Sequence, residues 1–108
     1  MTRLTSDFWV QAYLTRLQLA NIPAYVVAKG DATAGTILVK QNPLDGSATA
    51  YQRITAMDGT RPWDVLATGD EREVDAVLRE QRAFDHDLWL IEVEDRDGRH
   101  LLDEPGLG

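Results

Sequence analysis

Apolar residues near the N-terminus follow a helical spacing from about residue 6 to residue 20. Five of them recur at three- and four-residue intervals and share one helical face: Val10, Tyr13, Leu14, Leu17 and Ala20. Ser6 is the expected N-cap, and Asn21 with Pro23 ends the pattern. The sequence therefore predicts an amphipathic helix whose apolar face packs on the rest of the chain.

The same helix carries a second apolar seam, nearly opposite the first, formed by Phe8, Ala12, Thr15 and Leu19. A helix that is apolar on two sides is buried on both sides or contacts a partner. Phe8, Ala12 and Leu19 are therefore candidate interface residues for self-association. In the alternative, Phe8 folds under the N-terminal turn and Leu19 under the following strand.

Four short segments with strand patterns follow, at about 24–29, 36–41, 48–55 and 63–67. Turn-forming residues separate them, including Asn42-Pro43-Leu44-Asp45-Gly46 and Met57-Asp58-Gly59-Thr60. The Asp-Gly pair is typical of a hairpin because it accepts positive φ at low cost. Consecutive hairpins indicate a mostly antiparallel sheet.

A second helix is expected at about 71–84, because Asp70 and Glu73 have the spacing of a capping box. The strongest strand pattern follows at 88–94, and residues 99–102 form a possible short last strand. Residues 103–108 are expected to fray. The order α-β-β-β-β-α-β(-β) predicts one α+β domain over residues 1–108, with two helices on a mixed, mostly antiparallel sheet of five or six strands.

Charge and composition exclude several classes of protein. The chain has a net charge of −7, which divides into +1 over residues 1–69 and −8 over residues 70–108. No basic cluster is visible, so we expect no nucleic-acid partner. The acidity favours solubility or a docking surface for a basic partner. There is no cysteine, no apolar run long enough for a membrane span and no secretory pattern. We expect a cytoplasmic protein without a membrane partner.

The glycine loop, residues 30–35, begins at Gly30 and ends at Gly35. Such loops bind phosphate when they lead from a strand into a helix, whereas this one leads into another strand. It also lacks a Gly-Lys-Ser/Thr sequence. The loop is therefore interpreted as a flexible connection, or as a small binding lip with Asp31 and Thr33 at its tip.

Alternation along the strands provides further candidates. If the polar sides of the strands coincide, one sheet face carries three cations together with two tyrosines and two carboxylates: Lys29, Lys40, Arg53, Tyr25, Tyr51, Glu92 and Glu94. Cross-strand ion pairs are one interpretation. The other is a face that binds an anion or a peptide. The candidate ligand-binding residues are thus Lys29, Asp31, Thr33, Lys40 and Arg53.

No residue pattern predicts catalysis or a metal centre. His86 lies between two aspartates after the second helix and is expected to be a solvated loop residue. His100 could face Glu92 or Glu94 across a hairpin, but no metal-ligand spacing surrounds it. Neither serine lies in a Gly-x-Ser-x-Gly sequence. We therefore predict no catalytic residue, no metal and no cofactor.

The chain resembles a family of short bacterial proteins, about 110 residues long, catalogued as a domain of unknown function. The resemblance is carried by Arg3-Leu4-Thr5-Ser6 with Phe8-Trp9-Val10, by the glycine loop, and by Asp87-Leu88-Trp89, Glu92-Val93-Glu94-Asp95-Arg96 and Leu101-Leu102-Asp103-Glu104. It implies a small cytoplasmic α/β protein and no assigned activity.

From the sequence, the function is predicted to be that of a non-catalytic binding or regulatory module acting through protein–protein contacts. The alternative is a small enzyme or small-molecule-binding protein. Its site would lie at the glycine loop and the adjacent sheet face.

Overall fold

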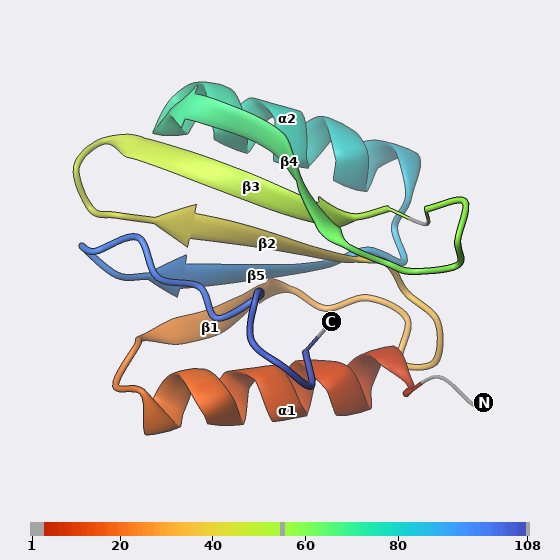
Figure 1. Ribbon diagram of the computed structural model, residues 1–108. Helices are drawn as coiled ribbons and strands as arrows, with labels where there is room; N and C mark the ends of the chain where they lie inside the picture. Colours follow the sequence, from red (N-terminus) through yellow and green to blue (C-terminus); the bar gives the residue numbers. More distant parts are fainter. Residues whose placement is uncertain (1–3, 55, 108) are drawn as a thin grey trace.

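Two helices cover opposite faces of a five-stranded sheet in the computed structural model, which describes residues 4–54 and 56–107 (Figure 1). The elements follow in the order α1 (Ser6–Leu19), β1 (Ala24–Ala28), β2 (Ile37–Asn42), β3 (Ser47–Arg53), β4 (Trp63–Asp70), α2 (Glu71–Phe84) and β5 (Trp89–Glu94). This order confirms the predicted α+β fold. Thr55, the predicted last residue of the third strand, lies outside the described residues.

The strands lie side by side in the order β1-β5-β2-β3-β4. Hairpins make β2, β3 and β4 antiparallel neighbours, as their turn residues predicted. The crossover through α2 then inserts β5 between β1 and β2, parallel to β2 and antiparallel to β1. The sheet is therefore mixed, with one parallel pair among the described strands.

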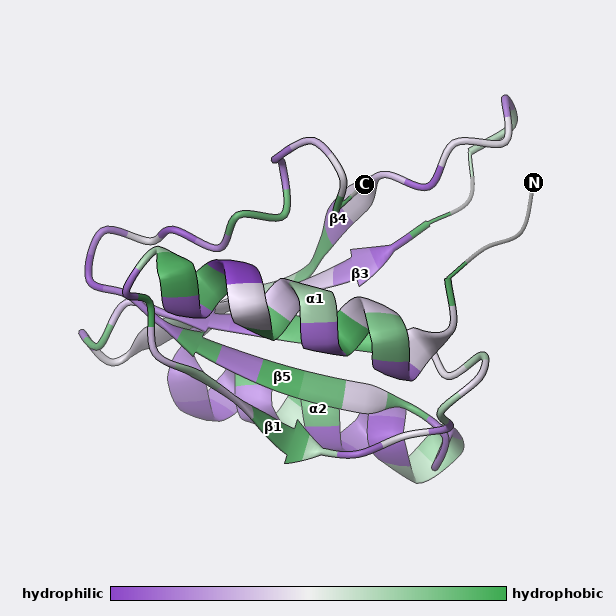
Figure 2. Cartoon of the chain, turned by 90° about the horizontal axis from the view of Figure 1, so that it is seen from below, coloured by the Kyte–Doolittle hydropathy of each residue, from purple (hydrophilic) through white to green (hydrophobic). Residues whose placement is uncertain are grey.

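One apolar core lies between α1 and the sheet (Figure 2). The predicted face of α1 supplies Val10, Tyr13 and Leu17, and Trp9 joins them. Their partners on the sheet are buried residues of β2 and β5: Val39, Trp89, Ile91 and Val93. These side chains alternate with residues facing the other way, as the two-residue period of a strand requires.

A second, smaller core lies under α2, whose Val74 and Leu78 pack on Leu38 and on the small residues of β3. Asp70 is the N-cap of α2, and its side chain accepts a hydrogen bond from the amide of Arg72 at 2.9 Å. This confirms the predicted helix start. None of the described helices is long and apolar enough to cross a membrane.

The N-cap of α1 differs from the prediction. Thr5 occupies that position, and Ser6 is the first helical residue. The Ser6 hydroxyl donates instead to the carbonyl of Gly35, at 2.7 Å. The Ser6 hydroxyl therefore makes a tertiary hydrogen bond to the glycine loop. The local sequence pattern had predicted that it would cap the helix.

The segment after β5 forms no sixth strand within the described residues. Leu101 has a φ of 61°, in the left-handed region, which interrupts the extended backbone that a strand at 99–102 would need. The chain runs along α1 instead: Tyr13 Oη donates to the carbonyl of His100 at 2.7 Å, and Arg16 Nη1 to that of Pro105 at 2.6 Å. We expected fraying from residue 103 onward, yet Leu107 is only 1% exposed in the core under α1.

Candidate functional site

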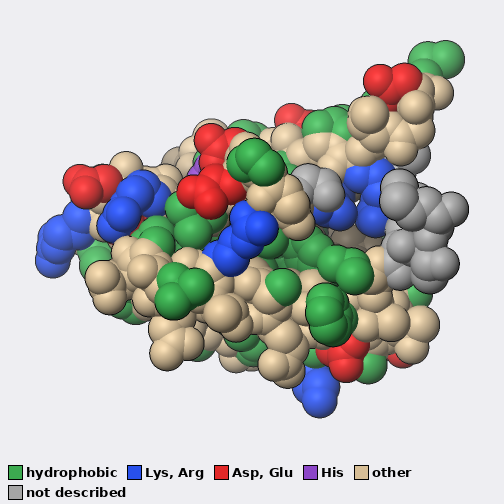
Figure 3. Space-filling view, turned by 60° about the horizontal axis from the view of Figure 1, so that its bottom comes forward, with side chains coloured by type: hydrophobic (Ala, Val, Ile, Leu, Met, Phe, Trp, Pro, Cys, Tyr) green, Lys and Arg blue, Asp and Glu red, His purple; other side chains and the backbone are tan. Residues whose placement is uncertain are grey.

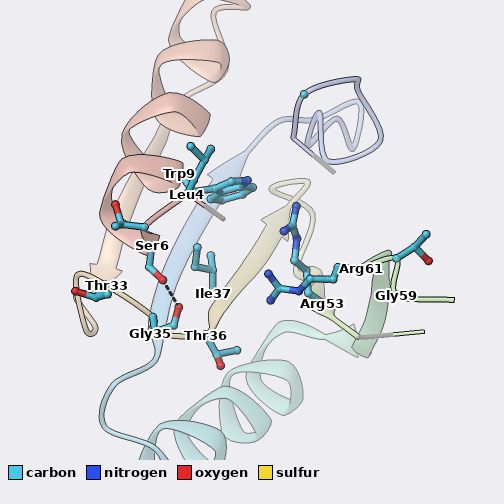
Figure 4. Close-up of a pocket in the computed structure, with 14 residues that line it drawn as sticks. Leu4, Ser6, Trp9, Thr33, Gly35, Thr36, Ile37, Arg53, Gly59 and Arg61 are labelled. Carbon is cyan, nitrogen blue, oxygen red and sulfur yellow. Dashed lines mark hydrogen bonds between the residues drawn. The ribbon is translucent and has the colours of Figure 1, made fainter. Parts of the chain in front are cut away.

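A hollow of about 940 Å³ opens at one end of the sheet, beside the first turn of α1 (Figure 4). Its walls come from four parts of the chain: the start of α1, the glycine loop with the first residues of β2, the end of β3 with the following turn, and Gly106. The volume lies within the range typical of small-molecule pockets. The hollow therefore includes the glycine loop and adjacent sheet face that the sequence suggested as an alternative site.

Asp31 organises the glycine loop from within. Its Oδ2 accepts hydrogen bonds from the amides of Thr33 at 3.2 Å and Ala34 at 2.8 Å. Its carbonyl accepts from the amide of Gly35 at 3.2 Å and from Trp89 Nε1 at 2.7 Å. The Asp31 side chain thus stabilises the turn.

The two glycines of the loop are explained by a close backbone approach. A Cβ atom on either Gly30 or Gly35 would overlap the carbonyl oxygen of Asp87. Only glycine fits where another backbone comes this near. The glycines therefore serve the packing of the loop on the segment before β5.

The loop also closes the N-terminal end of α1. The amide of Ser6 donates to the carbonyl of Thr33 at 3.1 Å, and the amide of Asp7 donates to that of Ala32 at 2.9 Å. These are amides of the first helical turn, which have no partner within a helix. The loop thereby fixes the position of Ser6 and Trp9 at the wall of the hollow.

Arg53 reaches the hollow from the end of β3. Its guanidinium carbon lies 4.9 Å from the ring centre of Trp63 and 5.5 Å from that of Trp9. Its Nη2 donates to the carbonyl of Leu107, which also accepts from Trp63 Nε1 at 3.5 Å. Arg53 therefore joins the sheet, α1 and the C-terminal segment.

Arg61 provides a second cation, from the turn between β3 and β4. Figure 4 shows Arg53 and Arg61 reaching from the β3 side toward Ile37 and the first turn of α1. Among the described residues that line the hollow, none is aspartate or glutamate. Arg53 and Arg61 thus place two guanidinium groups at the wall of the hollow, although the chain as a whole is acidic.

The structure distributes the five predicted ligand-binding residues over different places. Thr33 and Arg53 line the hollow, while Asp31 stabilises the loop that forms its wall. Lys29 is exposed beyond the end of β1, and Lys40 lies on the opposite face of the sheet.

The single polar face considered from the sequence does not form. Val39 pairs with Tyr51, and Lys40 pairs with Ala50. Directly opposite residues share a face, so Tyr51 faces α1 and Lys40 faces α2. The register separates the cations, and the sequence pattern contained no information on the register.

Lys40 belongs to a buried ionic cluster. Its side chain is 5% exposed, and its Nζ lies 2.7 Å from Glu71, 2.8 Å from Asp75 and 3.3 Å from Glu92. Burial alone would lower the pKa of Lys40, but hydrogen bonds to Asp75 and Glu71 and the charge of Glu92 outweigh it and raise the pKa above its ordinary value. The cross-strand ion pair between Lys40 and Glu92 matches the simpler interpretation of the sequence pattern.

His100 lies beside a second hollow of about 450 Å³, where its ring contacts that of Tyr51 at a tilt of 59°, with the ring centres 4.7 Å apart. Its Nδ1 accepts a hydrogen bond from the amide of Leu102 at 3.0 Å. Burial lowers the pKa of His100, and the charge of Asp103 opposes this only in part. No group of three metal-ligating side chains occurs among the described residues.

Ser6, Trp9 and Arg61 are among the residues of the main hollow that were not predicted from the sequence. The sequence held a signal for Arg61, because a hairpin around Asp58-Gly59 places the residues just before the next strand near the end of the preceding one. The described structure pairs Arg53 with Trp63 across that hairpin. Ser6 and Trp9 gave no comparable signal, since their place depends on where the glycine loop docks.

The candidate interface residues of α1 lie on its outer side. Phe8 is 60% exposed and Leu19 is 79% exposed, so the alternative in which the chain itself buries them is wrong. Hydrophobic side chains are visible on the surface that turns α1 toward the viewer (Figure 3).

The mixed sheet and its two covering helices define a small α+β protein with an arginine-lined hollow at one end of the sheet. The chain belongs to the DUF1491 family of proteins of unknown function, whose family model matches residues 4–103. This confirms the resemblance found in the sequence.

Solved structures of family members agree with this assignment. The chain is 40% identical to a DUF1491 family protein from Caulobacter crescentus CB15 in its crystal structure, with a TM-score of 0.88 over 95% of this chain and 98% of that chain. An NMR structure of a DUF1491 family protein from the same bacterium gives 39% identity and a TM-score of 0.83 over 97% of each chain. Protein Atu0922 from A. tumefaciens is 32% identical, with a TM-score of 0.73 over 86% of each chain. No protein with a curated description matches the chain.

Proposed function

We propose that this protein is a non-catalytic binding module that takes a small organic anion in the hollow beside the glycine loop. The observation that carries the proposal is that Arg53 and Arg61, from two different segments, both line this hollow beside the apolar side chains of Leu4, Trp9 and Ile37. Arginine is suited to such a site because its planar fork presents several donors to one anion.

The charge of the rest of the chain strengthens this argument. A protein with a net charge of −7 repels anions over most of its surface. Two guanidinium groups in a partly enclosed space then favour a ligand that fits the space as well as the charge. The Thr36 hydroxyl adds a further hydrogen-bonding group to the wall, whereas the hydroxyls of Ser6 and Thr60 already donate to the Gly35 carbonyl and the Asp58 carboxylate.

The lining favours binding over catalysis. The described lining residues include no histidine, cysteine or carboxylate that could exchange a proton near neutral pH. The Ser6 hydroxyl already donates to the carbonyl of Gly35. The groups at hand therefore hold and orient an anion.

The test measures thermal stability and tryptophan fluorescence with a panel of organic carboxylates and phosphate esters. A ligand at 100 times its Kd adds about 2.7 kcal/mol to the free energy of unfolding. We expect at least one anion to stabilise the protein, Arg61→Gln to abolish the effect, and the exposed Arg79→Gln on α2 to leave it unchanged. The proposal fails if no anion stabilises the protein, or if Arg61→Gln and Arg79→Gln behave alike.

Self-association through α1 is a second candidate function, favoured by the exposure of Phe8 and Leu19. Both side chains belong to one uncharged seam, which a second copy of the chain could cover. Sedimentation velocity over a concentration series is expected to show a dimer that Phe8→Ser with Leu19→Ser disrupts. Leu44→Ser, at another exposed position, is the matched control. A monomer at every concentration rules this candidate out.

A further inference from the structure

The strands β1 and β4 form the two edges of the sheet, because among the described strands β1 pairs only with β5 and β4 only with β3 (Figure 1). An edge strand presents a row of unpaired backbone N–H and C=O groups, which can pair with a strand of another chain. Proteins protect such edges with charged side chains, irregular backbone or a covering segment. The two edges of this sheet differ in that protection.

The β4 edge is protected by charge. Asp64 is the second residue of β4 and Asp70 is the last, and both are exposed. Gly69 has a φ of 137°, so the regular extended backbone ends just before α2. A strand added at this edge would lie against a carboxylate near each of its ends.

The β1 edge contains no charged residue. Its sequence is Ala-Tyr-Val-Val-Ala, and three successive side chains are exposed: Tyr25 by 46%, Val26 by 37% and Val27 by 50%. Figure 2 shows β1 as an apolar strand beyond β5, at the border of the sheet. A short segment with high β-propensity, no charge and no proline readily pairs with another strand. This edge is therefore open to strand addition.

The backbone of β1 limits where an added strand can pair. The Pro23 carbonyl accepts from the amide of Glu94 at 2.9 Å, so Pro23 points toward β5. Successive residues of an antiparallel strand point alternately to either side, so Ala24 and Val26 direct their N–H and C=O groups to the open side. A bulge between Val26 and Ala28 then interrupts the register. The pairing site is therefore the short stretch 24–26.

The side chains beside this stretch favour a cation. Tyr25, Glu92 and Lys40 form one row across β1, β5 and β2. Tyr25 Oη donates to the carboxylate of Glu94 at 3.3 Å. A basic side chain opposite Tyr25 on an added strand would lie next to its ring and within reach of Glu94. Lys29 follows β1 beyond the bulge, outside the pairing site.

A second copy of this chain fits the edge less well than a basic segment does. In a symmetric pairing over residues 24–26, Tyr25 would face the same tyrosine of the other copy, and β1 supplies no cation to place opposite it. Each copy also carries a net charge of −7, so the two copies repel each other. A basic segment is attracted by the same charge.

We infer that the β1 edge binds an extended segment of another protein in which a lysine or arginine lies between two apolar residues. The segment adds a strand along residues 24–26, with its basic residue opposite Tyr25. Its two apolar residues turn to the face that α1 covers, where Val26 lies opposite Ile91. No residue of β1 is among the described lining of the hollow beside the glycine loop, so this site is independent of the proposed anion site.

Three blocked heptapeptides test the inference by NMR titration and hydrogen exchange. The first has arginine between two valines, the second has glutamate in place of the arginine, and the third is the first with both valine amides N-methylated. We expect the first, at up to about 1 mM, to shift the amide signals of Ala24 and Val26 and to slow their exchange. The other two should bind at least about tenfold more weakly.

Three results overturn the inference. The first is an arginine peptide that leaves the β1 amides unchanged at that concentration. The second is equal binding of the glutamate peptide or of the N-methylated peptide, which contradicts the choice of a cation or the addition of a strand. The third is a dimer without peptide, seen by sedimentation, that protects the β1 amides, because the occupant is then a second copy of the chain.

Matched variants remove one acid from each edge of the sheet. Glu94→Gln is expected to weaken binding of the arginine peptide about fivefold, whereas Asp64→Asn leaves it unchanged. Equal weakening in both variants assigns the effect to net charge and contradicts pairing at β1. Val26→Pro removes an N–H group on the open side, at an edge position where proline is tolerated, and should abolish binding while the circular dichroism spectrum stays that of the wild type. Full binding by folded Val26→Pro also contradicts the inference.

Discussion

Lys40 and Arg53 lie on neighbouring strands, yet the structure treats these two cations differently. Lys40 faces α2 and meets three carboxylates within 3.3 Å. Arg53 faces α1 and lies over the rings of Trp9 and Trp63. One cation is neutralised inside the protein, and the other lines a hollow.

The difference follows from which part of the chain covers each face. The partners of Lys40 are Glu71, Asp75 and Glu92, all within residues 70–108, which carry a net charge of −8. The first turn of α1 and the glycine loop belong to residues 1–69, whose net charge is +1. The acidic start of α2 thus supplies two of the carboxylates that surround Lys40, and α1 supplies none at Arg53.

Removing the charge of Lys40 is expected to have the largest effect on the free energy of unfolding. Lys40→Met leaves three carboxylates without their shared cation, which costs about 3 kcal/mol, near the lower end for a buried pair because two of the carboxylates are partly exposed. Urea unfolding measures the change. The exposed Lys29→Met is the control and should stay within about 0.5 kcal/mol of the wild type.

Replacing Arg53 by methionine is expected to lower the free energy of unfolding by less than Lys40→Met does. Arg53→Met removes a hydrogen bond to the Leu107 carbonyl and two contacts with tryptophan rings, and should lower the free energy of unfolding by about 2 kcal/mol. It should also abolish anion-induced stabilisation, which Lys40→Met should preserve at a temperature where the variant is folded. A larger loss of stability in Arg53→Met than in Lys40→Met would reverse the comparison.

The smallest expected effect concerns pH on the α1 side. Burial holds the pKa of His100 below the ordinary value of 6.5, so the unfolded chain takes up the proton first as the pH falls. This contribution to stability is complete above about pH 6.5 and is lost as the pH falls toward the lowered pKa. His100→Asn retains an acceptor for the amide of Leu102 without a titrating ring, and should reduce the stability difference between about pH 7.5 and pH 5.5.

The matched control for this measurement is His86→Asn in the exposed loop after α2. It should keep the pH dependence of the wild type. An unchanged dependence in His100→Asn would show that groups other than His100 carry the effect.

Local patterns in the sequence predicted the elements well. The second helix begins and ends as expected, because Asp70 caps it and its apolar residues keep one spacing. The Asp58-Gly59 turn joins β3 and β4, with Gly59 at a φ of 86°. Such features depend on neighbours in the chain, and short-range physics is sufficient for them.

The site depended on long-range contacts that the sequence does not display. Arg53 was a candidate from strand alternation alone, but its partners Trp9 and Leu107 are more than forty residues away in either direction. A regular strand was possible at 99–102 from composition, and the left-handed φ of Leu101 excludes it. The register of the strands, the docking of the glycine loop on α1 and the path of the residues after β5 decide which side chains line the hollow.

The walls of the main hollow come from both ends of the described chain and from its middle, with Leu4 and Gly106 on the same rim. No contiguous fragment of the chain contains all the residues that line the hollow. Local unfolding that detaches α1 or the last residues from the sheet therefore removes part of its wall. A bound molecule would contact residues from both ends of the described chain and so hold them together without a covalent bond. Its occupancy would slow hydrogen exchange far from the contact itself, in α1 and in the segment that follows β5.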